Sequence, residues 1–147
     1  MLTWDDSMLT GIRDLDSQHW QIIEQCNGFA EALATDAFGA EEAEDMLDFL
    51  EFYAVAHFNR EEDYFQKYQC PAAAANKEAH ARFIERFGDF IEQWRQDGMD
   101  LETIEETFAE IVAWIETHIL RTGSQLRPCL AERSNQQTQE TPTVDPE

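Results

Sequence analysis

Four successive stretches of this chain carry apolar residues at the spacing i, i+3, i+4, i+7, which places them on one face of an α-helix. The alternation typical of strands is not sustained anywhere. Short connections favour antiparallel packing of successive helices, and 147 residues suit one compact domain. The pattern therefore predicts an all-α fold, an antiparallel up-and-down four-helix bundle with helices at about 18–36, 41–69, 72–96 and 101–121.

Residues that cap or break helices set these predicted boundaries. Asp16 and Ser17 are good N-cap types for the first helix. Pro71 disfavours helical geometry at Cys70, so the second helix is expected to end just before it. Gly123 is expected to cap the C-terminus of the fourth helix.

The two ends of the chain differ in composition from the predicted helices. Residues 1–17 combine a few apolar anchors with acids, and we expect an irregular arm laid across the bundle. The last dozen residues are polar with two prolines, so they cannot bury a core face. We therefore expect a helical domain over 1–126 and a flexible polar tail over 127–147.

A strong excess of acidic residues limits the partners of this chain. It has 31 Asp and Glu against 10 Lys and Arg, a formal net charge of −21. Such a surface repels phosphate backbones and anionic lipids, which argues against nucleic acid and membranes as partners. The sequence also lacks an apolar run long enough to span a bilayer.

The N-terminus and the cysteines bear on the compartment. The first residues have two early acids and no basic region ahead of an apolar run, unlike a Sec signal, so the cytoplasm is expected. The three cysteines, Cys26, Cys70 and Cys129, are odd in number, far apart and free of any C-x-x-C. We expect reduced structural thiols in a reducing compartment.

All four histidines fall on inward-facing stripes, one on each predicted helix. One such histidine is usually a hydrogen-bonded core residue, but four on four helices need a common cause. An up-and-down bundle brings all four to the same end, where a glutamate follows one of them by a helical turn. Imidazole and carboxylate groups that converge in a dry core are typical of a site for iron, zinc, copper or nickel. The predicted metal ligands are His19, His57, Glu61, His80 and His118.

Other four-helix proteins with histidines fit this pattern less well. Ferritin-like di-iron bundles use E-x-x-H pairs, and the sequence contains none. A phosphotransfer module needs one exposed histidine, whereas all of these are predicted to face inward. A haem would be crowded by four histidines and a glutamate at one height.

Five short strings occur in a specific order over most of the chain. They are D-x-Q-H ending at His19, H-F-x-x-E-E from His57, Y-x-C-P over 68–71, H-x-x-F from His80 and W-I-x-x-H-I from Trp114. In this order they resemble the hemerythrin family, and its bacterial single-domain branch in particular. The likeness extends from near the N-terminus to about residue 126.

The resemblance implies a four-helix bundle that holds a non-haem di-iron centre and binds O2 reversibly, as a binding protein rather than an enzyme. It implies that His19 and His57 hold the iron that binds O2. It also implies that His80 and His118 hold the other iron, and that Glu61 bridges the two.

Two ligand positions of the family pattern are altered in this chain. Asn76 stands where a histidine is expected and can offer a neutral amide oxygen, whereas Gly123 stands where a bridging aspartate is expected and offers nothing. Two ferrous ions would then share one inner carboxylate, which leaves uncompensated positive charge in a low-dielectric core. Helical geometry is expected to point the nearby acids away from the stripe, namely Glu62, Glu78 and Glu116.

Three functions remain open from the sequence. They are an O2-binding iron protein for storage, delivery or sensing, a protein with a single iron or zinc and altered redox chemistry, and a structural bundle whose metal site has decayed. If the altered positions matter, the chain holds nearer one iron than two. Asn76→His and Gly123→Asp together are then expected to raise the iron content toward two.

Overall fold

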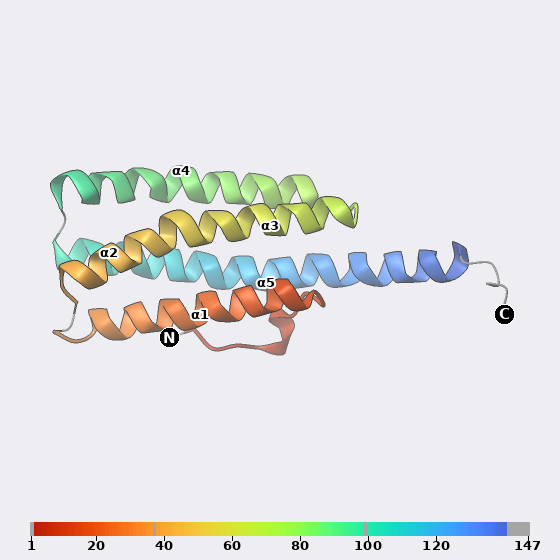
Figure 1. Cartoon of the computed structure of the whole chain (residues 1–147), viewed down its shortest axis with the longest axis horizontal. Coiled ribbons are helices and arrows are strands. Elements are labelled where there is room, and N and C mark those ends of the chain that lie inside the picture. Colours follow the sequence, from red (N-terminus) through yellow and green to blue (C-terminus); the bar gives the residue numbers. More distant parts are fainter. Residues whose placement is uncertain (1, 37, 99, 141–147) are drawn as a thin grey trace.

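The computed structural model describes residues 2–36, 38–98 and 100–140, with the backbone alone for 133–140. Four long antiparallel rods form a bundle, which confirms the all-α prediction, and the described residues contain no strand (Figure 1). No helix in this part of the chain is long and apolar enough to cross a bilayer. The rods are α1 (Arg13–Leu33), the continuous run of α2 (Ala40–Asp48), η2 (Phe49–Tyr53) and α3 (Ala54–Lys67), then α4 (Ala73–Asp97) and α5 (Leu101–Glu140).

Two apolar clusters fill the bundle. The main cluster takes the inward stripes of all four rods and includes Ile22, Phe58, Phe83 and Ile115. The smaller one, which we name the end cluster, lies beside the connection between α3 and α4 and consists of Ile12, Leu15, Phe65, Cys70, Leu126 and Cys129. Buried polar side chains occupy the layer between the two clusters, so the apolar core of the bundle is interrupted at this height.

The first helix begins earlier than its capping residues predict. Arg13 starts α1, and the N-cap residue Ile12 has no side-chain capping bond. Asp16 instead lies inside the first turn, where its carboxylate accepts hydrogen bonds from Thr10 N and Thr10 Oγ1, both at 2.8 Å. The predicted N-cap is therefore wrong, because this carboxylate holds the N-terminal arm against the helix start.

The second rod contains a π-helical turn and has a well-defined end. In η2 the N–H of Ala54 donates to the carbonyl of Phe49, five residues back. At the other end Gln69 is left-handed (φ 51°), and the N–H of Cys70 donates to Phe65 O at 3.0 Å. This is the Schellman pattern, so the rod ends two residues before the predicted limit of 69.

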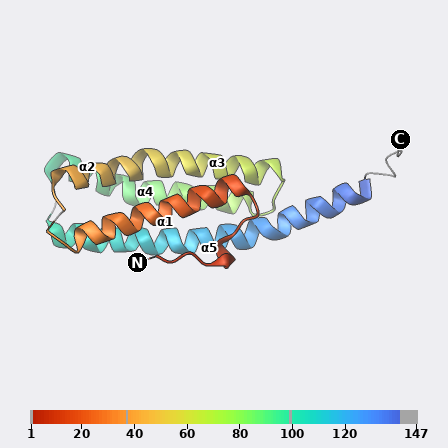
Figure 2. The ribbon, with the colours of Figure 1, turned by 60° about the horizontal axis from the view of Figure 1, so that its bottom comes forward.

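The last helix is much longer than predicted. It runs to Glu140 through Pro128, so the expected end near 121 and the C-cap role of Gly123 are wrong. Figure 2 shows α5 continuing beyond the other rods. The extension buries Leu126 and Cys129 in the end cluster, and this burial outweighs the cost of an internal proline. Residues 127–140 are thus helical, whereas the predicted tail residues 141–147 lie outside the described part.

Two of the cysteines form a disulfide, contrary to the expectation of three reduced thiols. Cys70 and Cys129 are bonded, with their Cα atoms 5.7 Å apart and a sequence separation of 59. Cys26 is free and lies in the main cluster, where burial raises the pKa of its thiol to about 12. The disulfide fastens the end of the second rod to the extension of α5.

Candidate metal centre

The four histidines and Glu61 meet in the polar layer between the two clusters. Each side chain is at most 5 % exposed, and each rod contributes at least one of them. Two groups of three share the glutamate, and within each group the candidate ligand atoms lie within 4.8 Å of one another. The groups are His19, His57 and Glu61, and Glu61, His80 and His118.

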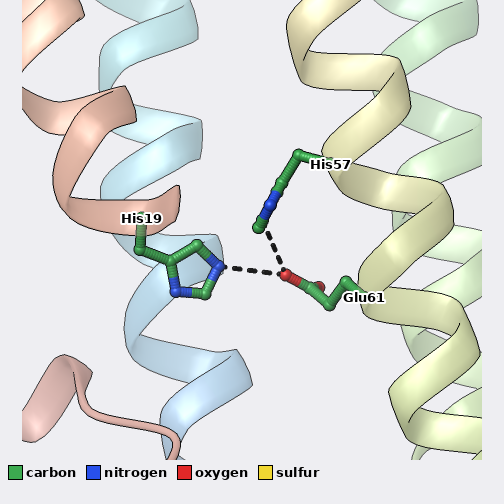
Figure 3. Close-up of side chains that lie close together, drawn as sticks. All are labelled: His19, His57 and Glu61. Carbon is green, nitrogen blue, oxygen red and sulfur yellow. Dashed lines mark hydrogen bonds and ion pairs between the residues drawn. The ribbon is translucent and has the colours of Figure 1, made fainter. Parts of the chain in front are cut away.

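The carboxylate of Glu61 divides the centre into two halves. Its Oε2 lies 3.1 Å from Nε2 of His19 and 3.1 Å from Nε2 of His57 (Figure 3). Its Oε1 lies 3.0 Å from Nε2 of His80 and 2.8 Å from Nε2 of His118. Each oxygen therefore faces a different pair of imidazoles, the arrangement expected of a carboxylate shared between two cation sites.

Burial and charge set the protonation of this centre. Burial alone would raise the pKa of Glu61, but the charges and hydrogen bonds of the surrounding histidines, His118 foremost, hold that pKa well below its usual value. Burial lowers the pKa of His57 from its usual value, against the opposing effect of Glu61. A charged Glu61 carboxylate and a His57 that readily loses its proton favour metal binding, which requires deprotonated ligands.

Two aromatic rings hold the histidines of the second half in place. Phe58 stacks on His80 with ring centroids 4.2 Å apart, and Trp114 stacks on His118 at 4.5 Å. Both stacks are nearly parallel, with interplanar angles of 10°. The imidazole planes are thus held before any ligand binds, which lowers the ordering cost of binding.

Two histidines have outer partners that the sequence analysis did not identify. The Nδ1 of His57 lies 2.7 Å from Gln18 Oε1, and the Nδ1 of His80 lies 3.0 Å from Glu62 Oε2. Glu62 lies off the inward stripe, as expected, but its carboxylate still reaches the outer nitrogen of His80. Consecutive helical residues project about 100° apart, so Glu61 faces the centre while Glu62 faces α4, where His80 stands.

Thr122 is a further site residue that the sequence analysis missed. Its hydroxyl lies 3.2 Å from Glu61 Oε1 and 2.8 Å from the carbonyl oxygen of His118. The side chain is 1 % exposed. The signal was present in the sequence, because Thr122 follows His118 by one helical turn on the same stripe.

Asn76, the residue at an altered ligand position, is 4 % exposed and lies one turn before His80 on α4. Its Nδ2 has no hydrogen-bond partner in the described structure. A buried amide without a partner is costly, and the oxygen and nitrogen of such an amide can exchange places by a flip. Glu78 and Glu116 are exposed, as expected.

Gly123, the other altered position, accommodates the N-terminal arm. A Cβ atom there would lie 2.9 Å from the carbonyl oxygens of Ser7 and Leu9 and 2.9 Å from Nη1 of Arg127. Arg127 donates from that nitrogen to the same two carbonyls, at 2.7 and 2.5 Å. The predicted effect of Gly123→Asp therefore meets an obstacle, because the arm occupies the space beside this position.

We expect Gly123→Ala to destabilise the protein by about 1–3 kcal/mol, because the added methyl group displaces the arm or Arg127. Gly28→Ala is the matched control, since Gly28 is also helical and a Cβ there meets nothing within 4 Å. The control is expected to gain about 0.5–1 kcal/mol from helix propensity. Urea unfolding of both variants measures the difference, and equal stability gains at the two positions would contradict the packing argument.

A small apolar cavity adjoins the centre. Its volume is about 20 Å³, and His19, His57 and His118 line it together with Ile22, Phe49, Ala54, Phe58, Phe83, Trp114, Ile115 and Ile119. Such a volume holds about one small molecule, and apolar walls offer a water molecule few hydrogen-bond partners. The cavity therefore suits a small apolar ligand that approaches the histidines.

Comparison with known proteins identifies the family of this chain. The family model described as "Hemerythrin HHE cation binding domain" matches residues 10–130. The chain is 30% identical over 121 residues to a bacteriohemerythrin of Stenotrophomonas maltophilia, covering 81% of this chain and 74% of that protein. It is 28% identical over 125 residues to a hemerythrin-like protein of Naegleria gruberi, with 84% and 87% covered. Because the family model matches residues 10–130, well over half of the sequence, this chain belongs to the hemerythrin family.

Proposed function

We propose that this protein is a non-haem iron protein that binds O2, with His19, His57, Glu61, His80 and His118 as the iron ligands. The observation that carries the proposal is the division of Glu61, whose two oxygens face two pairs of imidazole Nε2 atoms. Imidazole with carboxylate is a familiar donor set for ferrous iron. When bound, iron would supply the reversible redox chemistry that O2 binding requires.

The residues around the centre support this role. Phe58 and Trp114 fix two imidazole planes and exclude water from one side. The cavity beside His19, His57 and His118 offers an apolar space of the size of one small molecule. A dry, apolar approach favours a nonpolar diatomic ligand such as O2 over water or ions.

A second candidate is a protein with a single iron or zinc and altered redox chemistry. It is favoured by the composition of the centre, because among the described residues Glu61 is the carboxylate that faces the imidazole Nε2 atoms. Iron analysis and visible absorption distinguish the two. An iron centre that binds O2 gains a visible charge-transfer band on exposure to O2, whereas a zinc centre does not.

Cytoplasmic localisation and the absence of nucleic-acid and membrane partners remain predictions. The net charge of −21 supports the second of these. The Cys70–Cys129 disulfide weighs against the first, because structural disulfides are more typical of oxidising compartments.

His57→Ala is expected to reduce the iron content sharply, because it removes one of the two imidazoles that face Glu61 Oε2. Fe²⁺ added under anaerobic conditions should also raise the melting temperature of the variant by less than that of the unmodified protein. A ligand at 100 times its Kd stabilises the folded state by about 2.7 kcal/mol, and weaker binding reduces this stabilisation. Asn59→Ala, an exposed position on the same helix, is the control. Unchanged iron content in His57→Ala would count against the assignment.

A further inference from the structure

The outer nitrogens of the four histidines have unequal environments. The Nδ1 of His80 faces a carboxylate, that of Glu62, whereas the Nδ1 of His57 faces the neutral amide of Gln18. The Nδ1 atoms of His19 and His118 are buried and have no hydrogen-bond partner among the described residues. The two halves of the centre therefore differ by one negative charge outside the ring of inner side chains.

An acceptor at Nδ1 fixes the tautomer of an imidazole. The carboxylate and the amide oxygen both accept, so His80 and His57 can donate from Nδ1. With a cation bound, each imidazole would keep its proton on Nδ1 and turn the lone pair of Nε2 to the metal. A carboxylate does more than an amide, since it increases the basicity of the imidazole and brings negative charge toward a bound cation.

The half that contains His80 has the greater need for such charge. Three groups contact Glu61 Oε1, namely His80, His118 and the hydroxyl of Thr122, whereas two imidazoles contact Oε2. The Thr122 hydroxyl has one proton, which can go to the carbonyl oxygen of His118 at 2.8 Å or to Oε1 at 3.2 Å, and when it donates to Oε1 it competes with a cation there. In addition, Gly123 offers no carboxylate, and the N-terminal arm occupies the space beside it.

Glu62 is well placed to offset this deficit. Its side chain is 20 % exposed, its Oε2 lies 3.0 Å from His80 Nδ1, and it follows Glu61 directly on α3. We propose that Glu62 is a positioning residue that acts through His80 and compensates charge in the His80–His118 half, in place of a second inner carboxylate. This inference rests on the proposed function, since it requires a metal ion in that half.

The test uses Glu62→Gln, which retains an acceptor for His80 Nδ1 but removes the charge. Anaerobic titration with Fe²⁺ should show binding of one equivalent weakened about 10–100-fold, the usual range for loss of an outer partner. The midpoint reduction potential should move to more positive values, because a lost negative charge favours the ferrous state. Glu78→Gln is the matched control, an exposed acid two residues before His80 that pairs with Arg82.

A double variant distinguishes a positioning role from a merely structural one. If Glu62 acts through His80, adding Glu62→Gln to His80→Ala should weaken Fe²⁺ binding no further than His80→Ala alone. Gln18→Glu, which places a carboxylate beside His57, should strengthen binding in the other half. Circular dichroism and melting of the metal-free variants establish that each is folded.

The outcomes separate this inference from the function on which it rests. If the unmodified protein binds no Fe²⁺, the proposed function fails, and the role of Glu62 fails with it. Suppose instead that the unmodified protein binds Fe²⁺. If Glu62→Gln then has the same Fe²⁺ affinity and reduction potential as the unmodified protein or as Glu78→Gln, only the role of Glu62 is overturned. Additive losses in the double variant also overturn it.

Discussion

Replacing Glu61 with glutamine is expected to abolish metal binding in both halves of the centre. The substitution preserves the size of a fully buried side chain and removes the negative charge that all four imidazoles face. An amide also turns its NH2 group toward one pair of Nε2 atoms, where a cation would otherwise bind. We expect the affinity for Fe²⁺ to fall at least about 100-fold, beyond the usual loss for an outer partner.

Iron content per chain after anaerobic loading measures this effect, together with the rise in melting temperature that Fe²⁺ causes. Glu78→Gln removes one acidic charge at an exposed position and should retain both. Far-UV circular dichroism of the metal-free variant checks that the bundle forms. Retention of one iron by a folded Glu61→Gln protein would show that one half does not depend on the shared carboxylate.

Helical periodicity and connectivity are enough to predict most of this fold. The stripes on the four rods follow a period of 3.6 residues, and short connections make neighbours antiparallel. Those two constraints also bring His19, His57, His80 and His118 to one height, because each lies on an inward stripe. The convergence of the side chains was therefore predictable, whereas their binding of metal stays a prediction.

The outer partners were less predictable because they depend on faces between helices. Glu62 lies off the inward stripe of its own helix, and a helical projection correctly turns it away from the axis of the bundle. Its contact with His80 arises because α4 packs on that side of α3. A sequence pattern gives the facing of each helix but not the rotation of two helices against each other.

The end of α5 was mispredicted for a related reason. Gly123 and Pro128 both disfavour a helix interior, and local propensity therefore placed the end near residue 121. Tertiary contacts outweigh that preference, since Leu126 is fully buried in the end cluster and Gly123 lies against the arm. The extension brings Cys129 to Cys70, and no sequence pattern indicates this pair because its sequence separation is 59.

Reduction of the Cys70–Cys129 disulfide is expected to destabilise the metal-free protein by about 4 kcal/mol, the loop-closure value for a separation of 59 residues. The bonded segment contains all of α4 and most of the bundle portion of α5, so the cross-link restricts a large part of the unfolded chain. Both cysteines belong to the end cluster, in which Phe65 and Leu126 lie one helical turn beyond Glu61 and Thr122. Loss of the disulfide is therefore expected to loosen the end cluster, which packs directly against the layer of the metal centre.

Urea unfolding of the metal-free protein with and without dithiothreitol measures this loss as a lower midpoint. The double variant Cys70→Ser with Cys129→Ser should match the reduced protein and should not respond to dithiothreitol. That control separates the disulfide from Cys26, which remains in both proteins and is buried in the main cluster. If the oxidised and reduced proteins unfold at the same urea concentration, the cross-link adds nothing to the stability of the fold. The end cluster alone would then hold the extension of α5, because Leu126 and Phe65 are fully buried there.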